Sequence, residues 1–195
     1  MAPSPKKTRR DRGHLIFIDE SGLLMAPLTR KTWAPRGRTP ILKQRGRHRE
    51  KVSLAAALWL DSHGRPERLS YRTLADDYFD NVAVAAFLDD VMAQAPRSVT
   101  VVWDGGNMHK GDPIRDLLRR HRGRLRLERL PTYAPMLNPV EQLWLWLKYG
   151  RLCNYAAEDL PSLCRAAQRE LRSAQRTPSR LHSIWNACEL ATLLS

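Results

Sequence analysis

Residues 14–22 read His-Leu-Ile-Phe-Ile-Asp-Glu-Ser-Gly, a short apolar run that ends in two acidic residues, a serine and a glycine. A continuous apolar run of this length is typical of a buried strand, and the polar end predicts a turn. Residues 99–104, Val-Thr-Val-Val-Trp-Asp, repeat the arrangement. We therefore expect two core strands whose carboxyl ends bear Asp19 and Asp104.

The remaining patterns extend these two strands into an α/β domain. Residues 52–60 and 67–71 predict an antiparallel meander joined by a turn at 61–64, with short strand pieces possible at 23–28 and 41–43. Helical apolar spacing then alternates with one more strand: the helices cover 84–91, 114–118, 140–147, 160–171 and 181–188, and the strand covers 125–130. This order predicts a mixed five-stranded sheet with helices on both faces.

A third carboxylate, Glu141, falls in the first turn of a predicted helix that Asn138 caps and Pro139 begins. The ends of adjacent central strands lie side by side in a mixed sheet, so Asp19 and Asp104 can meet, and a helix packed across that edge can deliver Glu141. Hard cations such as Mg²⁺ prefer carboxylate oxygens and activate phosphodiester chemistry. The three residues therefore predict a divalent-metal site.

Each candidate also has a purely structural interpretation. Asp19 can serve as a turn residue, Asp104 can open an Asp-Gly turn, and Glu141 can complete a capping box at the start of its helix. Glu20 is the alternative to Asp19, although strand alternation points the two side chains apart. His109 is a candidate for contact with a phosphate or a metal ligand, but a lone histidine is more often a surface residue.

The charge of the chain favours a nucleic-acid partner. The net charge is +13, with 14 Lys and Arg against 4 Asp and Glu in residues 1–51, and 8 against 3 in residues 110–129. Segregated positive charge suits a surface that follows phosphates, and a generic basic surface or an RNA-binding protein is the alternative. Residues 1–13 predict a disordered basic arm, followed by one domain over 14–195.

A basic loop lies between the first two predicted strands. Its prolines and glycine at 32–40 exclude regular structure, so its arginines project from a stiffened loop. Trp33 in this loop is a candidate for stacking on a base or for covering the core. Five basic side chains of this region are predicted to contact DNA: Arg36, Arg38, Lys43, Arg45 and Arg47.

Composition indicates a soluble intracellular protein with a full core. Hydrophobic residues make up 43% of the 195 residues, and six are Trp. The three cysteines match no zinc or redox spacing and predict reduced core thiols: Cys153, Cys164 and Cys188. The longest apolar runs fall well short of the roughly 18 residues of a membrane span, and the N-terminus lacks the apolar core of a signal peptide.

Four segments together resemble a known family. They are residues 17–22 (Phe-Ile-Asp-Glu-Ser-Gly), 32–37 (Thr-Trp-Ala-Pro-Arg-Gly), 101–104 (Val-Val-Trp-Asp) and 130–144 (Leu-Pro-Thr-Tyr-Ala-Pro-Met-Leu-Asn-Pro-Val-Glu-Gln-Leu-Trp). In this order they resemble the catalytic domain of bacterial insertion-sequence transposases of the mariner-like DDE superfamily. The last segment is the most specific, and the resemblance runs from about residue 14 to 152.

The resemblance implies a ribonuclease H-like fold, two Mg²⁺ or Mn²⁺ ions, and DNA cleavage followed by strand transfer. It assigns the family's three acidic metal ligands to Asp19, Asp104 and Glu141. The implied partners are double-stranded DNA, as element ends and target, and a second copy of the chain in the active complex. The implied location is the bacterial cytoplasm, in association with the nucleoid.

Two features differ from the family pattern. Family members often have Asn directly after the second aspartate and His soon after, whereas Gly105 and Gly106 here precede Asn107 and His109, so no role is transferred to the latter two. Helix-turn-helix domains precede the catalytic domain in these transposases, but the chain begins only about 13 residues before its first strand. We expect a catalytic half served by a separate helix-turn-helix polypeptide. The alternatives are a catalytically silent DNA-binding remnant or regulator, and a nuclease acting on RNA–DNA hybrids.

Overall fold

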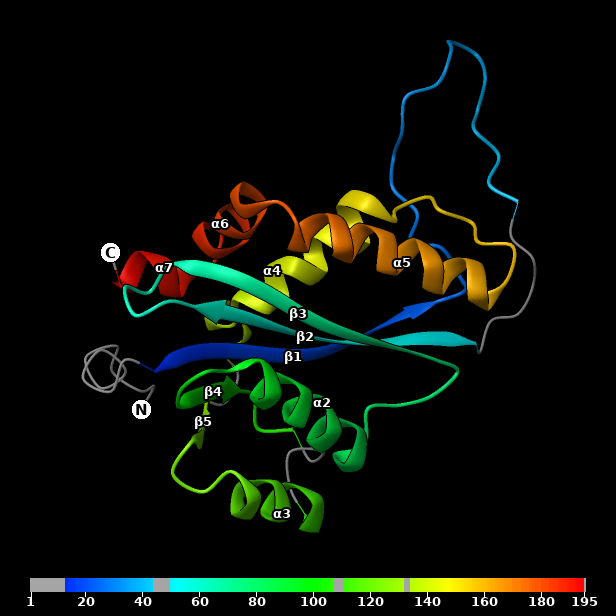
Figure 1. The fold of residues 1–195 in the computed structure, drawn as a ribbon. Coiled ribbons are helices and arrows are strands. Elements are labelled where there is room, and N and C mark those ends of the chain that lie inside the picture. The colour runs from blue at the N-terminus through cyan, green and yellow to red at the C-terminus, as the bar shows by residue number, and fades with distance from the viewer. Residues whose placement is uncertain (1–12, 44–49, 107–110, 132–133, 195) are drawn as a thin grey trace.

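The computed structural model describes residues 13–43, 50–106, 111–131 and 134–194. These form a five-stranded sheet in the order β3-β2-β1-β4-β5, with helices against it (Figure 1). The strands are β1 (His14–Leu24), β2 (Lys51–Leu60), β3 (Pro66–Ala75), β4 (Val99–Trp103) and β5 (Leu125–Arg129). The helices are α2 (Asn81–Gln94), α3 (Asp112–Arg120), η2 (Pro135–Leu137), α4 (Pro139–Leu145), η3 (Trp146–Arg151), α5 (Leu160–Gln175), α6 (Pro178–Asn186) and α7 (Glu189–Leu194).

The sheet is mixed, as predicted. β1, β2 and β3 form an antiparallel meander, while β4 pairs parallel to β1 and β5 parallel to β4. β1 is therefore the central strand, where the antiparallel and parallel halves of the sheet meet. Both faces of β1 and β2 are covered, which explains why these strands read as nearly continuous apolar runs rather than as alternating ones.

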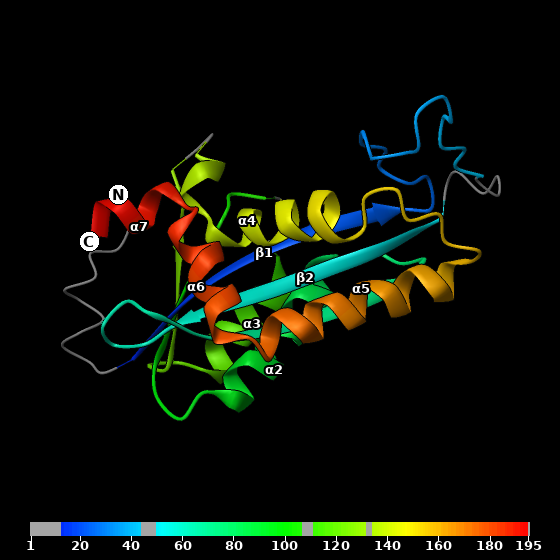
Figure 2. The same cartoon turned by 90° about the horizontal axis from the view of Figure 1, so that it is seen from above.

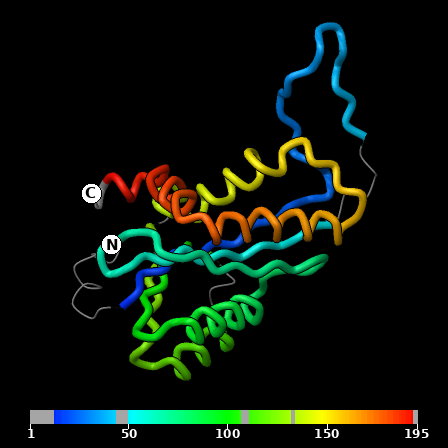
Figure 3. Tube along the Cα trace, turned by 45° about the horizontal axis from the view of Figure 1, so that its top comes forward, coloured from blue at the N-terminus to red at the C-terminus, as the bar shows by residue number. Residues whose placement is uncertain are grey.

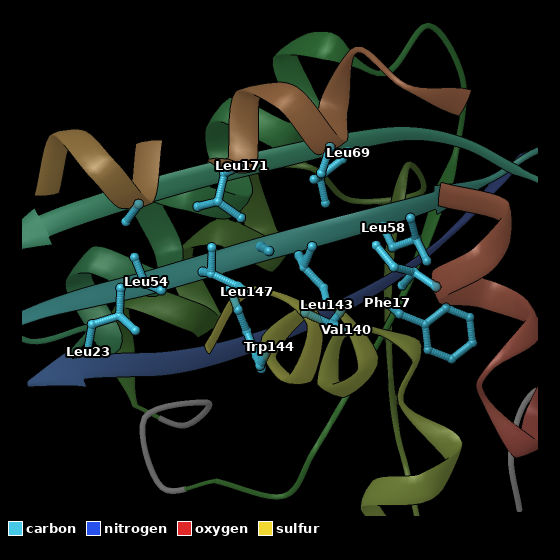
Figure 4. Packing of buried hydrophobic residues seen from close by; sticks show 14 of the residues in the cluster. Phe17, Leu23, Leu54, Leu58, Leu69, Val140, Leu143, Trp144, Leu147 and Leu171 are labelled. Atoms are coloured by element: carbon cyan, nitrogen blue, oxygen red, sulfur yellow. The ribbon is translucent and has the colours of Figure 1, made fainter. Parts of the chain in front are cut away.

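Helices cover both faces of the sheet, which confirms the predicted layers. Helices α2 and α3 pack on one face, and α4, α5 and α6 on the other (Figure 2). Strand alternation assigns the side chains of β1 to these layers, so Ile16 and Ile18 face α2 while Phe17 faces α4 and α6. Figure 4 shows Phe17 among the side chains of β2 and α4, including Leu58 and Val140.

β1 is longer than expected, and the turn predicted at residues 19–22 is wrong. The strand continues to Leu24 because residues 20–24 pair with residues 51–55 of β2. The hydrogen bonds of this pairing satisfy backbone N–H and C=O groups of residues whose side chains favour a turn. Of the short strand pieces expected at 23–28 and 41–43, only residues 23 and 24 are in a strand.

The predicted start of α4 is confirmed, because the helix begins at Pro139 behind Asn138. Asp80 caps α2 by accepting a 2.8 Å hydrogen bond from the backbone N–H of Ala83. α4 passes directly into η3, a π-helical stretch that the sequence pattern did not indicate. The last predicted helix is broken between α6 and α7, so Cys188 lies between two helices rather than within one.

The three cysteines are unpaired, with Cys188 buried and the other two partly buried. This agrees with the predicted reduced thiols. No helix within the described residues is both long and apolar enough to cross a membrane.

Candidate active site

Asp19 and Asp104 lie side by side at the centre of the sheet. Phe17 of β1 pairs in parallel with Val102 of β4, so the two aspartates each come two residues further along their segments. β4 ends at Trp103, and Asp104 follows at its carboxyl end, as predicted. Asp19 instead lies within β1, next to the point where its neighbour β4 stops.

Alternation along β1 decides which acidic side chain enters the site. Asp19 has the same parity as Phe17, so it projects toward α4, whereas Glu20 belongs to the opposite face. Asp19 is buried, with 8% of its surface exposed, and it lines the pocket described below, which Glu20 does not. The structure therefore favours Asp19 over Glu20.

Asn138 fixes the start of α4 against β1. Its side-chain oxygen accepts a 3.1 Å hydrogen bond from the backbone N–H of Val140, and its Nδ2 donates to the carbonyl of Ile18, also at 3.1 Å. Asn138 is only 2% exposed, so this double link is shielded from water. One residue thus caps the helix that bears Glu141 and ties it to the strand position before Asp19.

The three carboxylates face one pocket of about 490 Å³. Asp19 enters from β1, Asp104 from the end of β4 and Glu141 from the first turn of α4. The rest of the wall comes from the end of β5, from the segments that follow β4 and β5, and from the loop before α4: Gly105, Gly106, Arg129, Leu130, Pro131, Ala134, Pro135 and Asn138. The structure therefore brings the predicted acidic residues to a common cavity from three distant parts of the chain.

Burial and mutual repulsion raise the pKa values of two carboxyl groups in this pocket. The pKa of Asp19 is raised to about 8, first by burial and then by the negative charge of Glu141, with smaller contributions from Glu20 and Asp104. The pKa of Glu141 is also raised, by burial and by Asp104, while the positive charge of Lys148 opposes the shift. Acidic groups that destabilise one another in this way form a site that a cation would stabilise.

Trp144 and Lys148 are site residues that the sequence reasoning missed. The indole Nε1 of Trp144 donates a 2.8 Å hydrogen bond to Oδ2 of Asp19, although the sequence placed Trp144 only on the buried stripe of the helix. Lys148 is half-buried. Burial lowers the pKa of its ammonium group, and the negative charges of Glu141 and Asp19 oppose this shift. Their spacing, three and seven residues after Glu141, places all three on one helical face and is the signal that could have indicated them.

The structural alternatives are resolved differently for the three carboxylates. Asp104 does make a turn, because its Oδ1 accepts a 2.9 Å hydrogen bond from the N–H of Gly106, and the same side chain lines the pocket. Asp19 is in a strand rather than a turn. The capping box predicted as an alternative for Glu141 is not needed, since the N–H of Asn138 donates to the carbonyl of Pro135 at 2.9 Å.

The chemistry of the donor set fits hard divalent cations. Three carboxylates, one of them oriented by an indole N–H, offer the oxygen ligands that Mg²⁺ and Mn²⁺ prefer. Among the described residues, no three acidic, His or Cys side chains are gathered into a ready-made metal cluster. Asp19, Asp104 and Glu141 thus share a pocket and repel one another across it rather than forming a closed cage.

The predicted DNA-contacting loop projects away from the sheet after the end of β1 (Figures 1 and 3). Arg36, Arg38 and Lys43 are exposed there, and none of them lines the acidic pocket. Trp33 is fully exposed, which excludes the core-covering interpretation. Arg45 and Arg47 lie outside the described residues, as do Asn107, His109 and the predicted arm apart from Gly13.

The base of this loop is held by Asn154, which follows η3. The side-chain oxygen of Asn154 accepts a 2.8 Å hydrogen bond from the N–H of Arg30, and its Nδ2 donates to the carbonyl of Arg30 at 3.0 Å. The N–H of Asn154 also donates to the carbonyl of Leu28 at 2.8 Å. The loop therefore leaves the body of the domain from a fixed point.

A family model described as DDE superfamily endonuclease matches residues 14–164. The chain belongs to this family. The match includes Asp19, Asp104 and Glu141 and ends within α5. No curated protein sequence matches the chain.

Solved structures of Mos1 transposase share the fold of this DDE-family chain. The Mos1 mariner paired-end complex with Mn is 15% identical, with a TM-score of 0.66 over 97% of this chain and 56% of that one. The paired-end complex with the left transposon end is 16% identical, with a TM-score of 0.64 and the same coverage. The isolated Mos1 catalytic domain is 12% identical, with a TM-score of 0.60 over 97% of this chain and 84% of that one.

These likenesses establish the fold, which is the ribonuclease H-like fold of the Mos1 catalytic domain and confirms the expected fold class. The chain spans 56% of the Mos1 chains in the two paired-end complexes. It corresponds much more closely in extent to the isolated catalytic domain, of which it covers 84%.

Proposed function

We propose that this chain is the catalytic domain of a DNA transposase of an insertion sequence, which cleaves phosphodiester bonds and transfers the cut strand to a target. The observation that supports this most strongly is the convergence of Asp19, Asp104 and Glu141 on one pocket in a chain that belongs to the DDE superfamily endonucleases. The likeness to Mos1 complexes that contain transposon-end DNA supports the choice of substrate.

In this proposal the three carboxylates hold two divalent ions, Mg²⁺ or Mn²⁺. When bound, the ions would activate the attacking oxygen and stabilise the leaving oxygen of an in-line displacement at phosphorus. Structures of Mos1 transposase with Mn and with Mg support this choice of metals.

The surrounding residues hold the carboxylates in place and balance their charge. Trp144 orients Asp19 through its indole hydrogen bond, and Asn138 keeps the first turn of α4 against β1. Lys148 offsets the negative charge of Glu141. Arg129, the last residue of β5, also lines the pocket, where its guanidinium can bind a phosphate oxygen. Each of these roles is part of the proposal and can be tested by substituting the residue.

The proposed partners are the double-stranded ends of the element and the target DNA. We propose that Arg36, Arg38, Lys43, Arg45 and Arg47 contact this DNA, that two copies of the chain act together, and that a helix-turn-helix polypeptide supplies recognition of the ends. The paired-end arrangement of the Mos1 complexes supports the pairing of two copies.

The test is nicking of supercoiled plasmid by the purified protein with Mg²⁺ or Mn²⁺, with EDTA as the blank. Asp104→Asn removes one proposed ligand at constant size, while Asp116→Asn, at a partly exposed position on α3, removes one charge outside the pocket as the matched control. We expect nicking by the wild type and by Asp116→Asn and at least a hundredfold loss in Asp104→Asn. Equal nicking by all three proteins would refute the site. DNA binding with no nicking by the wild type would favour the catalytically silent remnant.

A further inference from the structure

Helix α5 presents a row of arginines on its exposed face. The positions follow a 4-3-4 spacing, which keeps them on one side of an α-helix, and α6 adds a fifth arginine beyond the turn. All are exposed: Arg165, Arg169, Arg172, Arg176 and Arg180. Residues 160–186 contain these five arginines and a single acidic residue, Glu170. This stretch lies outside the two segments whose charge first indicated a nucleic-acid partner.

The arginines of α3 differ, because each one that could face DNA is paired within the domain. Salt bridges join Arg115 to Asp112, Arg119 to Asp116, and Arg120 to Asp89. A phosphate would have to compete with these carboxylates. Within the 110–129 segment, whose charge favoured a nucleic-acid partner, these three arginines of α3 are therefore already paired.

On α5, only one arginine of the row has a carboxylate partner in a salt bridge among the residues that the structure describes. Glu170 is buried and accepts from Arg151 at 2.7 Å and from Arg169 at 3.1 Å. Burial alone would raise the pKa of Glu170, but the hydrogen bonds and charges of the two arginines outweigh it and lower that pKa. In the described part of the chain, Arg165, Arg172 and Arg176 have no salt bridge, although Arg165 donates a 2.9 Å hydrogen bond to Oγ of Ser162 and its charge acts on Asp159. Their positive charge is available to an external anion.

The row borders a groove of about 490 Å³ that runs along α5 from Arg165 to Thr177. Eleven residues of α-helix separate Arg165 from Arg176, which at 1.5 Å per residue is about 16 Å. DNA rises about 3.4 Å per base pair along its axis, so the row is as long as roughly five base pairs of duplex. The guanidinium fork suits phosphate oxygens better than an ammonium group does.

α5 is held firmly on the sheet beneath these arginines. Gln168 donates a 2.8 Å hydrogen bond to Oγ1 of Thr73, and Gln175 donates at 2.8 Å to the carbonyl of Leu69, both on β3. The opposite stripe of the helix is apolar and buried against the sheet. α5 packs on β3 and α4 on β1 (Figure 2), so α4 separates the arginine row from the acidic pocket.

We propose that the arginine row of α5 is a second DNA-binding surface. It binds the phosphate backbone of a stretch of duplex DNA that is distant from the bond that is cleaved. This rests on the proposed function only in taking DNA as the partner, because the binding itself needs neither metal nor catalysis. Because these arginines would contact phosphates rather than bases, they would not distinguish one DNA sequence from another. The row adds salt-sensitive affinity and positions a stretch of duplex that the acidic pocket does not contact.

Binding of a fluorescent 30-base-pair duplex in EDTA, from 50 to 200 mM NaCl, tests the proposal. Arg172→Gln/Arg176→Gln removes two charges from the row, and Arg115→Gln/Arg119→Gln removes two paired charges from α3 as the matched control. Arg172→Lys/Arg176→Lys keeps the charge. We expect the α5 glutamine variant to bind about tenfold more weakly, with a salt slope lower by about 1.8. The α3 variant should bind within twofold of the wild type, and the lysine variant should keep the slope.

Equal affinity and slope in the wild type and the α5 glutamine variant would overturn the proposal, as would equal losses in the α5 and α3 variants. Circular dichroism and thermal unfolding show whether each variant is folded. Plasmid nicking by the same proteins separates the two proposals. If the wild type does not nick plasmid but the α5 glutamine variant still binds DNA more weakly than the wild type, the arginine surface is supported and the catalytic function is refuted.

Discussion

The indole Nε1 of Trp144 donates a 2.8 Å hydrogen bond to Oδ2 of Asp19, which joins the first turns of α4 to the central strand inside the acidic pocket. Burial and the charge of Glu141 raise the pKa of Asp19, and this hydrogen bond is the influence that opposes them. Trp144 therefore favours the charged form of the carboxylate and fixes its orientation. A metal ligand needs both.

Replacing Trp144 by Phe should impair the site while leaving the fold intact, because one aromatic ring remains while the N–H donor is lost; the buried volume lost with the second ring is matched in the control. Substitutions that remove such supporting hydrogen bonds typically cost about 10- to 100-fold in metal affinity or activity, and we expect a loss of this size in plasmid nicking. Trp59→Phe is the control, since its indole donates to Ser70 at 3.0 Å in the core on the α2 side. Similar losses in both variants would contradict the positioning role.

The raised pKa of Asp19 predicts a pH-dependent stability in the absence of metal. A carboxyl group that binds its proton more tightly in the folded state stabilises the fold below its unfolded pKa of about 4, and this contribution is lost as the pH rises through about 8. Between these limits the wild type in EDTA should lose on the order of 6 kcal/mol more than Asp19→Asn, at about 1.4 kcal/mol per pKa unit over the shift to about 8. Urea unfolding at several pH values measures the difference. Parallel pH curves for the two proteins would show that Asp19 is not perturbed.

Divalent cations should reverse that loss. A cation that binds only the folded protein raises its stability in proportion to the logarithm of its concentration over the Kd, and it replaces the proton that Asp19 otherwise retains. Mn²⁺ at pH 8 should therefore raise the Tm of the wild type by several degrees, and EDTA should restore the lower value. Asp104→Asn should show little of this shift. An equal shift in that variant would place the ion elsewhere.

Asn138 should matter more to stability than an ordinary helix cap. Asn138→Ala removes a cap, worth roughly 0.5–2 kcal/mol, and leaves the buried carbonyl of Ile18 without its partner, at about 1–3 kcal/mol. Asp159→Ala is the comparison, because Asp159 caps α5 at an exposed position by accepting from Ser162 at 2.7 Å. Denaturant unfolding should show a clearly larger loss for Asn138→Ala, together with reduced nicking. Equal losses would mean that the link to β1 contributes nothing.

The strands and most helices could be predicted from the sequence because apolar runs and caps are local signals. The position of Asp104 after β4, and that of Glu141 in the first turn of α4, followed from such signals alone. The end of β1 could not be predicted in this way. Asp19 to Gly22 favour a turn locally, but pairing with residues 53–56 of β2 continues the strand through them, and this pairing is a tertiary effect.

The acidic trio could be predicted, but its supporting residues could not. Trp144 and Lys148 look like an apolar and a polar helix position until the packing of α4 on β1 shows which side chain each one faces. The pairing of the α3 arginines is only partly visible in the sequence. Asp112 and Asp116 stand three residues before Arg115 and Arg119, a spacing that permits pairing on a helix, whereas the pairing of Arg120 with Asp89 depends on tertiary packing.

The most direct test of the central claim is the position of Mn²⁺ in crystals grown with the metal, measured by anomalous diffraction. The proposed two-ion site predicts two peaks about 3.5–4 Å apart, both bound by carboxylate oxygens of Asp19, Asp104 or Glu141. In Asp104→Asn crystals, at least one of the two peaks should be lost. Mn²⁺ bound elsewhere in the wild type, with none between these three carboxylates, would contradict the assignment of this pocket as the catalytic centre.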